Sequence, residues 1–518
     1  MEPEKNNEVN STSSGPNRQM ASQKNVAPLP KGASIYFMGI AGTGMGTVAG
    51  LFKEAGYHVL GSDAGVYPPM SNLLNDLNIE VKTPYHPSNL SQLEKSPDLV
   101  VVANCLSRGH EELESLLASE IPYTSFPKLL GDEFLANQES IVVTGTHGKT
   151  TTSSLLTHVL KELGHDPGYV IGGVPKSFGK SFHVGAGNLF VTEGDEYDTA
   201  FFDKESKFLH YYPKTLLINN LEFDHADIFN SLEDIKRMFA KLIDKVKDKK
   251  SIICNWDDDN VRGLILSKGL ENQVTKISLS YLGISRDQKA VHSVEAANLE
   301  KVNVNTPLMW TMNLKTVTWG EQILKTPMSG HHNMYNACMA LAAISNLIER
   351  NVIEKPDFTM VQDAFLKFEN VKRRLDHLGS RNGIDVYEDF AHHPTAVAHI
   401  IETFRHSAPN KRIVACFEPK NATARRNIFE DDYAEKLAGA DLVLIGASPV
   451  DLRIPEENRM NTNNICKKIG SHAKNFSTNE ELLDWASANL KKDDVVIFMS
   501  SGSFSGIQHK LLEALGEQ

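Results

Sequence analysis

The sequence predicts an α/β fold with three domains in series, each built around a parallel sheet. Three observations lead to this prediction. The chain has 518 residues, which is too long for one core when a domain takes about 100–200 residues. Short apolar, β-rich runs alternate with amphipathic helical segments along most of the chain. Two of these runs lead into glycine-rich turns that open a helix, which is where many α/β proteins bind phosphate groups.

The composition narrows the class of protein. The apolar share of 41% and the formal charge of −12 fit a soluble globular protein, and they leave no overall basic field for nucleic acid or an anionic membrane. The five cysteines are scattered, without a CxxC pair, which favours reduced thiols in a cytoplasm over a disulfide framework. No stretch has the ~18 uninterrupted apolar residues that a membrane-spanning helix needs. We therefore expect a cytoplasmic protein without membrane insertion.

Residues 1–32 are expected to form a disordered polar tail. They are rich in Asn, Ser, Glu and Pro, and cannot bury enough apolar surface to order themselves. They also lack the apolar core of a secretory signal. The ordered chain is therefore expected to begin with the first apolar run.

The first domain is expected at residues 33–137. A strand is predicted for "SIYFMGI", a helix for "GTGMGTVAGLFKEAGY", and a second strand for "HVLGSD", which ends on Asp63; "PDLVVVAN" is a later strand of the same sheet. The turn fits the dinucleotide fingerprint, with Asp63 placed to meet a ribose hydroxyl. Taken alone it favours NAD, but it equally serves any ligand with a diphosphate and a ribose, or close packing of the helix. The candidate binding residues are Gly42, Thr43, Gly44, Met45, Gly46 and Asp63.

The central domain, expected at residues 138–370, opens with the second turn. "SIVVTGTHGKTTT" runs from a strand into a helix that Gly164 ends. Backbone N–H groups, the helix N-terminus and Lys149 can point at phosphate oxygens, and Thr150 can hold Mg²⁺. Val143 stands where the general phosphate-loop signature has glycine, so this loop is a shortened one. The candidate nucleotide-binding residues are Gly145, Thr146, His147, Gly148, Lys149, Thr150 and Thr151.

Acidic residues follow two later strands of the central domain. They are Glu193, Asp195, Glu196 and Asp198 after "NLFVT", and Asp224 with His225 after "TLLIN". Carboxylates that emerge from a strand end beside a phosphate loop are natural ligands for Mg²⁺, which prefers oxygen. A solvated acidic turn is the alternative for any one of them. The domain closes with a long helix predicted from His332.

A third α/β unit is expected at residues 371–518. Strand and helix alternate again through "GIDVYEDFAHHPTAVAHIIETFR", "KRIVACFEP", "ADLVLIGAS" and "DDVVIFMSSGSFSGIQHKLLEAL". Arg373 and Arg374 stand at its entrance, and Asp389, His392 and His393 end its first strand. An arginine and a carboxylate from this domain can clamp a triphosphate and a ribose when the domains close. The paired histidines lack a neighbouring Cys or Glu, so no structural zinc is predicted.

Four stretches, in this order along the chain, resemble the signatures of the ATP-dependent Mur ligases: "GTHGKTTT", "HHNMYN" with "ALAA", "VKRRLD" and "EDFAHHPT". The resemblance covers nearly the whole chain from Ser34 onward. It implies an N-terminal Rossmann-like domain for a UDP-sugar, a central P-loop ATPase-like domain and a C-terminal Rossmann-like domain for a peptide. It also implies that ATP lies on the Gly145 loop and that the first loop holds the diphosphate of the UDP-sugar, not NAD.

The resemblance further implies a reaction. In this family a muramyl carboxylate attacks the γ-phosphate of ATP, and an incoming amine displaces phosphate from the acyl phosphate. "GSDAGVYPPMS", "EGDEYDTAFFDKESKF" and "NNLEFDHADIF" resemble the members that join L-alanyl-γ-D-glutamyl-meso-diaminopimelate to UDP-N-acetylmuramate in peptidoglycan recycling. The alternative within the family is the ligase for free L-alanine, and the alternative from another class is an NAD-dependent dehydrogenase. The implied substrates are UDP-N-acetylmuramate, a murein tripeptide and ATP, with Mg²⁺.

The resemblance also assigns roles to single residues. Lys149 matches the residue that stabilises charge on the transferring phosphoryl group. Thr150 and Glu193 match ligands of the Mg²⁺ that bridges the terminal phosphates, and His225 matches a ligand of a second Mg²⁺. Catalysis is thus implied for Lys149, Glu193 and His225. Contacts to the nucleotide are implied for Asn333, Asn336, Arg374 and Asp389.

Some features are left open by the family pattern. Lys241 lies one position from the place where several Mur ligases carry a carbamylated lysine, so it stays unassigned. "FEPKNATARR" differs from the "EPRSNT" pattern of the tripeptide ligases, which leaves the acceptor in question. A tripeptide with several carboxylates needs cationic partners in the third domain; the candidates are Lys420, Arg425, Arg426 and Arg453. The oligomeric state is not predicted.

Overall fold

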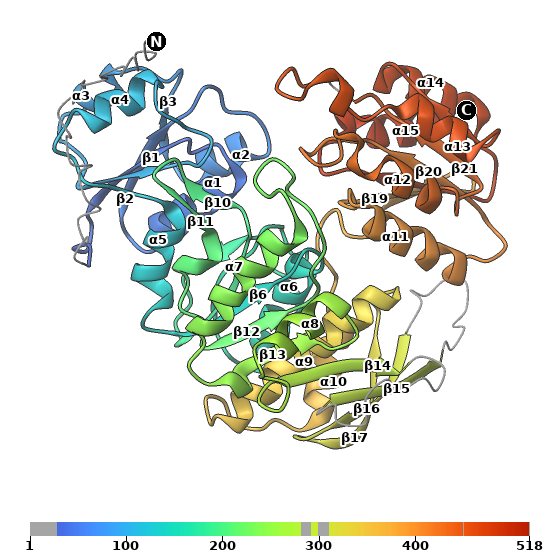
Figure 1. Cartoon of the computed structure of the whole chain (residues 1–518), viewed down its shortest axis with the longest axis horizontal. Coiled ribbons are helices and arrows are strands. Elements are labelled where there is room, and N and C mark those ends of the chain that lie inside the picture. The colour runs from blue at the N-terminus through green and yellow to red at the C-terminus, as the bar shows by residue number, and fades with distance from the viewer. Residues whose placement is uncertain (1–27, 281–291, 299–309, 449, 517–518) are drawn as a thin grey trace, which may run out of the picture.

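The structure is a computed structural model that describes residues 28–280, 292–298, 310–448 and 450–516. Three α/β domains follow one another along the chain, so the predicted fold class is confirmed. In Figure 1 the first domain (blue) and the third (orange to red) lie on opposite sides above the central domain (green to yellow). Most of the predicted tail falls outside the described residues. Leu29, within it, donates its backbone N–H to Glu133 Oε1 at 3.1 Å.

The first domain contains a five-stranded parallel sheet in the order β3-β2-β1-β4-β5. The strand order reverses at β1, so the loops after β1 and β4 diverge and leave a crevice of the kind where such sheets bind ligands. Its elements are β1 Ser34–Met38, α1 Thr43–Glu54, β2 His58–Ser62, α2 Met70–Asp76, β3 Glu80–Lys82, α3 Ser88–Ser91, β4 Leu99–Val102, α4 Glu111–Leu117, β5 Tyr123–Thr124 and α5 Phe126–Leu130.

The central domain contains a ten-stranded sheet in the order β17-β16-β15-β14-β13-β12-β6-β9-β7-β8. Its middle is parallel, whereas β16, β17 and β8 pair antiparallel at the two edges. Its strands are β6 Glu139–Thr144, β7 Gly168–Val170, β8 Phe182–His183, β9 Leu189–Glu193, β12 Thr215–Ile218, β13 Ile252–Asn255, β14 Thr275–Ser280, β15 His292–Asn298, β16 Trp310–Thr316 and β17 Gly320–Thr326. A separate hairpin pairs β10 Asp198–Ala200 with β11 Asp203–Ser206.

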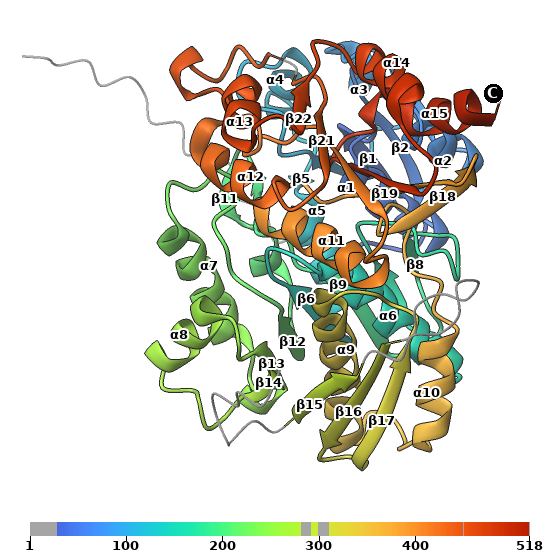
Figure 2. The same cartoon turned by 90° about the vertical axis from the view of Figure 1, so that its right-hand side faces the viewer.

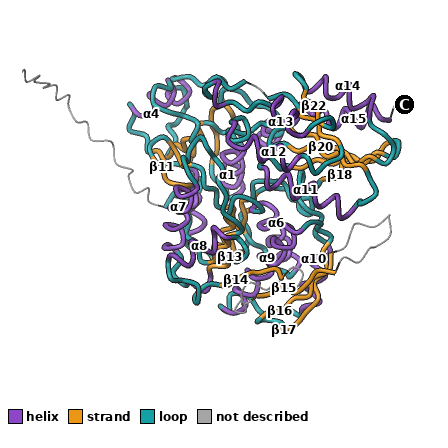
Figure 3. The backbone as a smooth tube through the Cα atoms, turned by 45° about the vertical axis from the view of Figure 1, so that its right-hand side comes forward, coloured by secondary structure: helices purple, strands orange, loops and turns teal. Residues whose placement is uncertain are grey.

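Helices cover both faces of the central sheet. They are α6 Lys149–Glu162, α7 Leu232–Lys245, α8 Asp259–Ser267, α9 His331–Glu349 and α10 Phe358–Leu366. Ile141, Val142 and Val143 of β6 are fully buried, as expected for a parallel strand covered on both faces. In Figure 3, α7 and α8 lie on one side of the central strands and α6 and α9 on the other.

The third domain contains a six-stranded sheet in the order β18-β19-β23-β20-β21-β22, parallel except for β18. Its elements are β18 Asp376–Arg381, β19 Ile384–Asp389, α11 Pro394–Ser407, β20 Arg412–Phe417, α12 Glu430–Leu437, β21 Leu442–Ile445, α13 Thr462–Ile469, β22 Ala473–Asn475, α14 Asn479–Asn489, β23 Asp494–Met499 and α15 Ile507–Gly516. In Figure 2, α11 lies on the side of this domain that faces the central domain.

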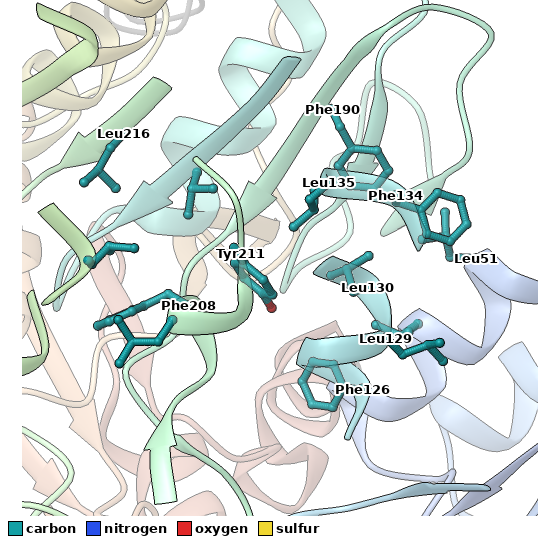
Figure 4. Close-up of a cluster of buried hydrophobic side chains, with 14 of the residues drawn as sticks. Leu51, Phe126, Leu129, Leu130, Phe134, Leu135, Phe190, Phe208, Tyr211 and Leu216 are labelled. Atoms are coloured by element: carbon teal, nitrogen blue, oxygen red, sulfur yellow. The ribbon is translucent and has the colours of Figure 1, made fainter. Parts of the chain in front are cut away.

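The first and central domains share one continuous apolar core. Phe126 and Leu130 of α5 and Phe134 after it belong to the same buried cluster as Phe190 of β9 and Phe208 (Figure 4). The rings of Phe134 and Phe190 lie with centroids 5.9 Å apart across the junction. The buried clusters of the third domain contain third-domain residues only. Among the described helices, none is both long enough and apolar enough to cross a bilayer.

We expect glycine-to-alanine changes at two helical glycines to have opposite effects. A Cβ at Gly131, at the junction of the first two domains, would lie 2.1 Å from the carbonyl oxygen of His210. Gly131→Ala should therefore cost about 1–3 kcal/mol of unfolding free energy, as overpacking typically does. A Cβ at Gly263 inside α8 meets nothing within 4 Å, so Gly263→Ala should gain up to ~1 kcal/mol of helix propensity. Thermal melts of both variants check this. Equal melting temperatures would contradict it.

Candidate active site

The first glycine loop joins β1 to α1, and Asp63 closes it. Asp63 Oδ2 accepts a hydrogen bond from the backbone N–H of Ala41 at 2.8 Å. Gly39 at the start of the loop has a φ of 89°. A Cβ there would lie only 2.6 Å from Ala103 Cβ, so the loop can pass this close to the chain after β4 only with glycine at this position. Asp63 thus lies at the loop, as its predicted role requires, but its carboxylate also braces the loop.

The other predicted residues of this loop differ in what they offer a ligand. Gly42, Thr43 and Gly44 are exposed at the start of α1. Met45 is buried in the core, and a Cβ at Gly46 would lie 3.0 Å from the carbonyl oxygen of Ile40. A ligand on this loop therefore meets backbone groups, and the side chain of Met45 is turned away from it.

The second glycine loop joins β6 to α6 and is held from the end of β12. Asn220 accepts hydrogen bonds from the backbone N–H of His147 at 2.7 Å and of Thr146 at 3.1 Å. Gly145 and Gly148 have φ values of 125° and 83°, which residues with a Cβ rarely adopt. Because α6 begins at Lys149, the free N–H groups of its first turn open onto this loop and suit an anion. Thr151 is buried in that first turn.

Lys149 is paired inside this loop. Its Nζ donates to the carbonyl oxygen of Gly145 at 2.7 Å and to Glu196 Oε2 at 3.1 Å. The other oxygen of Glu196 lies 3.2 Å from His225 Nε2. Burial alone would raise the pKa of Glu196, but the charge of Lys149 and the hydrogen bond with His225 lower it to about 2. Glu196 is therefore ionised between two predicted catalytic residues, although the family resemblance assigned a role only to Glu193.

Glu193 and Thr150 fit a magnesium ion. Thr150 Oγ1 donates to Glu193 Oε2 at 3.0 Å, and Gly172 donates its N–H to Glu193 Oε1 at 2.6 Å. An oxygen separation of 3.0 Å is that of neighbouring ligands around an octahedral ion with metal–oxygen distances of about 2.1 Å. Burial raises the pKa of Glu193, and the nearby charge of Asp195 adds to this. A divalent cation would offset both effects. His225 contacts Glu196 and not Glu193 or Thr150. The two predicted metal positions are therefore built from different side chains.

Two predicted site residues of the third domain, Arg374 and Asp389, make different kinds of contact. Arg374 Nη2 lies 3.5 Å from Thr150 Oγ1, and its guanidinium group lies 5.0 Å from the centre of the Phe390 ring. Asp389 instead accepts hydrogen bonds from the backbone N–H groups of Leu375 and Ala391, both at 2.7 Å. Arg374 therefore faces the predicted phosphate position, whereas Asp389 fixes the chain that carries it.

Asn333 and Asn336 lie in the first turns of α9, next to the second loop. Asn336 Oδ1 accepts from Thr152 Oγ1 at 3.0 Å, and Asn336 Nδ2 donates to Asn333 Oδ1 at 3.0 Å. Both side chains are buried. A Cβ at Gly148 would lie 2.4 Å from Asn336 Oδ1. The two asparagines are thus brought to the loop, where they contact each other and α6.

A third cluster joins the central and third domains, and the sequence did not reveal it. Glu222 Oε2 lies 3.4 Å from His147 Nε2 and 3.1 Å from His393 Nδ1, and it accepts from Thr395 Oγ1 at 2.7 Å. The three ligand atoms of His147, Glu222 and His393 lie within 4.8 Å of one another. The carboxylate that contacts His393 is that of Glu222, which follows β12 and is distant from His393 in the chain.

Sequence comparison assigns the chain to a family. Three models match it: "Mur ligase family, catalytic domain" at residues 34–138, "Mur ligase middle domain" at 143–344, and "Mur ligase, glutamate ligase domain" at 373–502. Together they span most of the chain. The chain belongs to the Mur ligase family. The resemblance predicted from the sequence is confirmed.

Individual Mur ligases match along nearly their full length. The chain is 38% identical over 486 residues to a protein of Escherichia coli (strain K12) named UDP-N-acetylmuramate--L-alanyl-gamma-D-glutamyl-meso-2,6-diaminoheptandioate ligase, covering 93% of this chain and 98% of the relative. It is 28% identical to a UDP-N-acetylmuramate--L-alanine ligase of Desulforapulum autotrophicum, covering 94% and 99%. A solved murein peptide ligase from Psychrobacter arcticus 273-4 has a TM-score of 0.67 at 30% identity, covering 94% and 99%.

Two of the four cationic candidates for a peptide pocket in this Mur ligase form ion pairs. Arg425 and Arg453 both contact Asp451, at 3.3 and 2.8 Å. A Cβ at Gly502 would lie 2.8 Å from Lys420 Cγ, so the stem of Lys420 packs on the end of β23. Lys241 contacts the half-exposed Glu205 at 2.7 Å. The role of each of these residues remains a prediction.

We expect Glu222→Gln to weaken the docking of the third domain in a pH-dependent way. Burial would raise the pKa of Glu222, but His147, His393 and Thr395 lower it to about 2. A lowered carboxyl pKa stabilises the fold above the unfolded value of about 4.5, and this stabilisation is lost as the pH falls through the folded value. The variant should lose on the order of 1–3 kcal/mol at pH 7.

Denaturant unfolding from pH 7 down to pH 3 measures this effect. The gap between Glu222→Gln and the wild type should narrow as the pH falls from ~4.5 toward 3. Glu402→Gln, an exposed change on α11, is the matched control. A gap that does not depend on pH would refute the prediction.

Proposed function

We propose that this Mur ligase uses ATP to join L-alanyl-γ-D-glutamyl-meso-diaminopimelate to UDP-N-acetylmuramate, as a step of peptidoglycan recycling. One observation carries the proposal: the Lys149 loop with its Thr150–Glu193 pair and the first glycine loop belong to two domains that share one apolar core. A ligand that spans both loops can bring a carboxylate to ATP. The name of the Escherichia coli relative supplies the substrates. A dehydrogenase would need only the first loop, and family membership argues against it.

In the proposed reaction, an oxygen of the muramyl carboxylate attacks the γ-phosphorus of ATP, and ADP leaves. The amine of the tripeptide then attacks the acyl carbon, inorganic phosphate leaves and the amine loses a proton. Lys149 and Arg374 would stabilise negative charge on the transferring phosphoryl group, an electrostatic role typical of such enzymes. Backbone N–H groups of the two loops would hold the diphosphate and the triphosphate.

We further propose Mg²⁺ as the metal. Thr150 and Glu193 would hold it, with His225 at a second position, and it would neutralise phosphate charge when bound. The fit of the Thr150–Glu193 oxygen pair supports the first position. The second position requires His225 to exchange its contact with Glu196 for the metal. Asn333, Asn336 and Asp389 are proposed to position the nucleotide.

The domain limits predicted above, 33–137, 138–370 and 371–518, are proposed as the UDP-sugar, ATP and peptide domains. The cytoplasm is the proposed compartment, since ATP is made there and the five cysteines are free thiols. The alternative reaction uses free L-alanine as the acceptor. The lower identity of the L-alanine ligase relative, 28% against 38%, favours the tripeptide.

The choice of acceptor can be measured directly. With ATP, Mg²⁺ and UDP-N-acetylmuramate present, the tripeptide should release ADP at least tenfold faster than L-alanine at equal concentration, a difference of about 1.4 kcal/mol in activation free energy. Mass spectrometry should find the intact tripeptide joined through its alanine amine. If L-alanine is the better acceptor, the enzyme is the alanine ligase. If neither acceptor releases ADP, the proposed function is wrong.

Charge removal at two residues tests the ATP site. Lys149→Met should reduce ligation ~10²–10³-fold, since it removes a preorganised charge and keeps the alkyl stem. Lys161→Met, at the other end of α6, is the matched control.

Glu193→Gln should instead raise the Mg²⁺ concentration needed for half-maximal rate. Its control is Glu205→Gln, which removes an exposed carboxylate. Wild-type magnesium dependence in Glu193→Gln would remove Glu193 from the metal site.

A further inference from the structure

Lys207 carries an ammonium group that lies between two aromatic rings. It is the first residue of a 3₁₀ turn, Lys207–His210, directly after β11. Its Nζ lies 5.1 Å from the ring centre of Phe126 and 5.0 Å from that of Tyr197. Within the described part of the chain, no carboxylate oxygen lies within 4.0 Å of this nitrogen and it donates no hydrogen bond. Ring faces attract a cation but leave its charge unneutralised.

The two rings connect Lys207 to both glycine loops. On one side, a Cβ at Gly44 of the first loop would lie 3.5 Å from Phe126 Cζ. On the other side, the ring of Tyr197 lies with its centroid 3.9 Å from that of His225, and His225 contacts Glu196, the partner of Lys149. Lys207 therefore stands between the predicted UDP-sugar position and the predicted ATP position.

The carboxylates of Asp195, Asp198 and Glu196 lie near Lys207 but form their ion pairs with Lys149 and Lys204. The side chain of Lys207 is only partly buried. Burial lowers the pKa of Lys207, and the charges of Asp195, Asp198 and Glu196 offset part of this effect, while the like charge of Lys149 adds to it. Lys204, in the same hairpin, differs because its Nζ contacts Asp198 at 2.7 Å. Lys204 is already ion-paired, so Lys207 is the one of these two lysines that can form an ion pair with a substrate anion.

We propose that Lys207, between Phe126 and Tyr197, binds the carboxylate of the UDP-sugar and holds it between the two glycine loops. This inference rests on the proposed function, because that substrate has its diphosphate on the first loop and its reacting carboxylate at the second. The motif "EGDEYDTAFFDKESKF" resembles the tripeptide ligases in the sequence, and its last lysine thereby gains a role in recognising the sugar acid rather than the peptide. Lys207 is a substrate-positioning residue in this account.

The test compares two nucleotide sugars that differ in the acid. Titration calorimetry without ATP measures the affinity for UDP-N-acetylmuramate and for UDP-N-acetylglucosamine, which lacks the lactyl carboxylate. Lys207→Met should weaken binding of the first by roughly 10- to 100-fold, the size expected for a hydrogen bond to a charged group. Its affinity for the second should stay at the wild-type value. Lys207→Arg should keep most of the preference, and Lys204→Met is the matched control.

Three outcomes would overturn the inference. They are a wild type that binds both sugars equally, a Lys207→Met variant that keeps the preference, and a variant that loses both ligands in the same proportion, which indicates a structural role. Unchanged affinity for UDP-N-acetylglucosamine shows that the variant is folded. Release of ADP by the wild type with both substrates is measured alongside. If the wild type turns over and the sugar preference does not depend on Lys207, this inference fails while the proposed function stands.

Discussion

The apolar core shared by the first and central domains is the constraint on which the site depends. Phe134 and Phe208 come from different domains and lie in one buried cluster. Dense apolar packing resists shear, because any separation exposes apolar surface or opens a cavity. The ring of Phe182 in the central domain lies 2.4 Å from the place that a Cβ of Gly50 in α1 would take. The two domains therefore pack so closely here that only glycine fits. The two glycine loops are therefore held at a fixed spacing, and a single ligand can bridge them only if its length matches.

The third domain is attached by a different kind of contact. Its two large apolar clusters are its own, and most of its named contacts to the central domain are polar, such as Lys176 with Asp376 and His393 with the carbonyl oxygen of Phe223. The ring pair of Phe223 and Phe429 is an apolar contact between the two domains. Polar contacts can be exchanged for water at little cost. This interface suits a domain that opens and closes, whereas the shared core suits a fixed platform. Arg374 would then reach the phosphates only when the domain is docked.

The sequence predicts those features that depend on local chemistry. Glycine spacing located both loops, and a helix follows each of them as expected, from Thr43 and from Lys149. It could not choose among the acids after β9, because Glu193 and Glu196 differ only in how the chain turns beyond the strand. It could not pair Glu222 with His393, which are distant in the chain. Packing directs the side chain of Met45 into the core, so the predicted ligand contact of Met45 would have to be made by its backbone. The antiparallel edge strands β16 and β17 were likewise not anticipated.

The pairing of Lys149 gives a physical reason for nucleotide and metal to bind together. Lys149 donates to Glu196, and a triphosphate on the Gly145 loop would compete for the same ammonium group. Glu196 is almost fully buried, so the loss of that partner would leave its charge with His225 alone, and a buried charge that loses a partner is destabilised. Burial also raises the pKa of Glu193, so its ionised form is disfavoured until a cation binds beside it. A divalent cation that arrives with the phosphates offsets both penalties at once. In the proposed mechanism, the carboxylates around Lys149 would oppose binding of a bare triphosphate and favour binding of its magnesium complex.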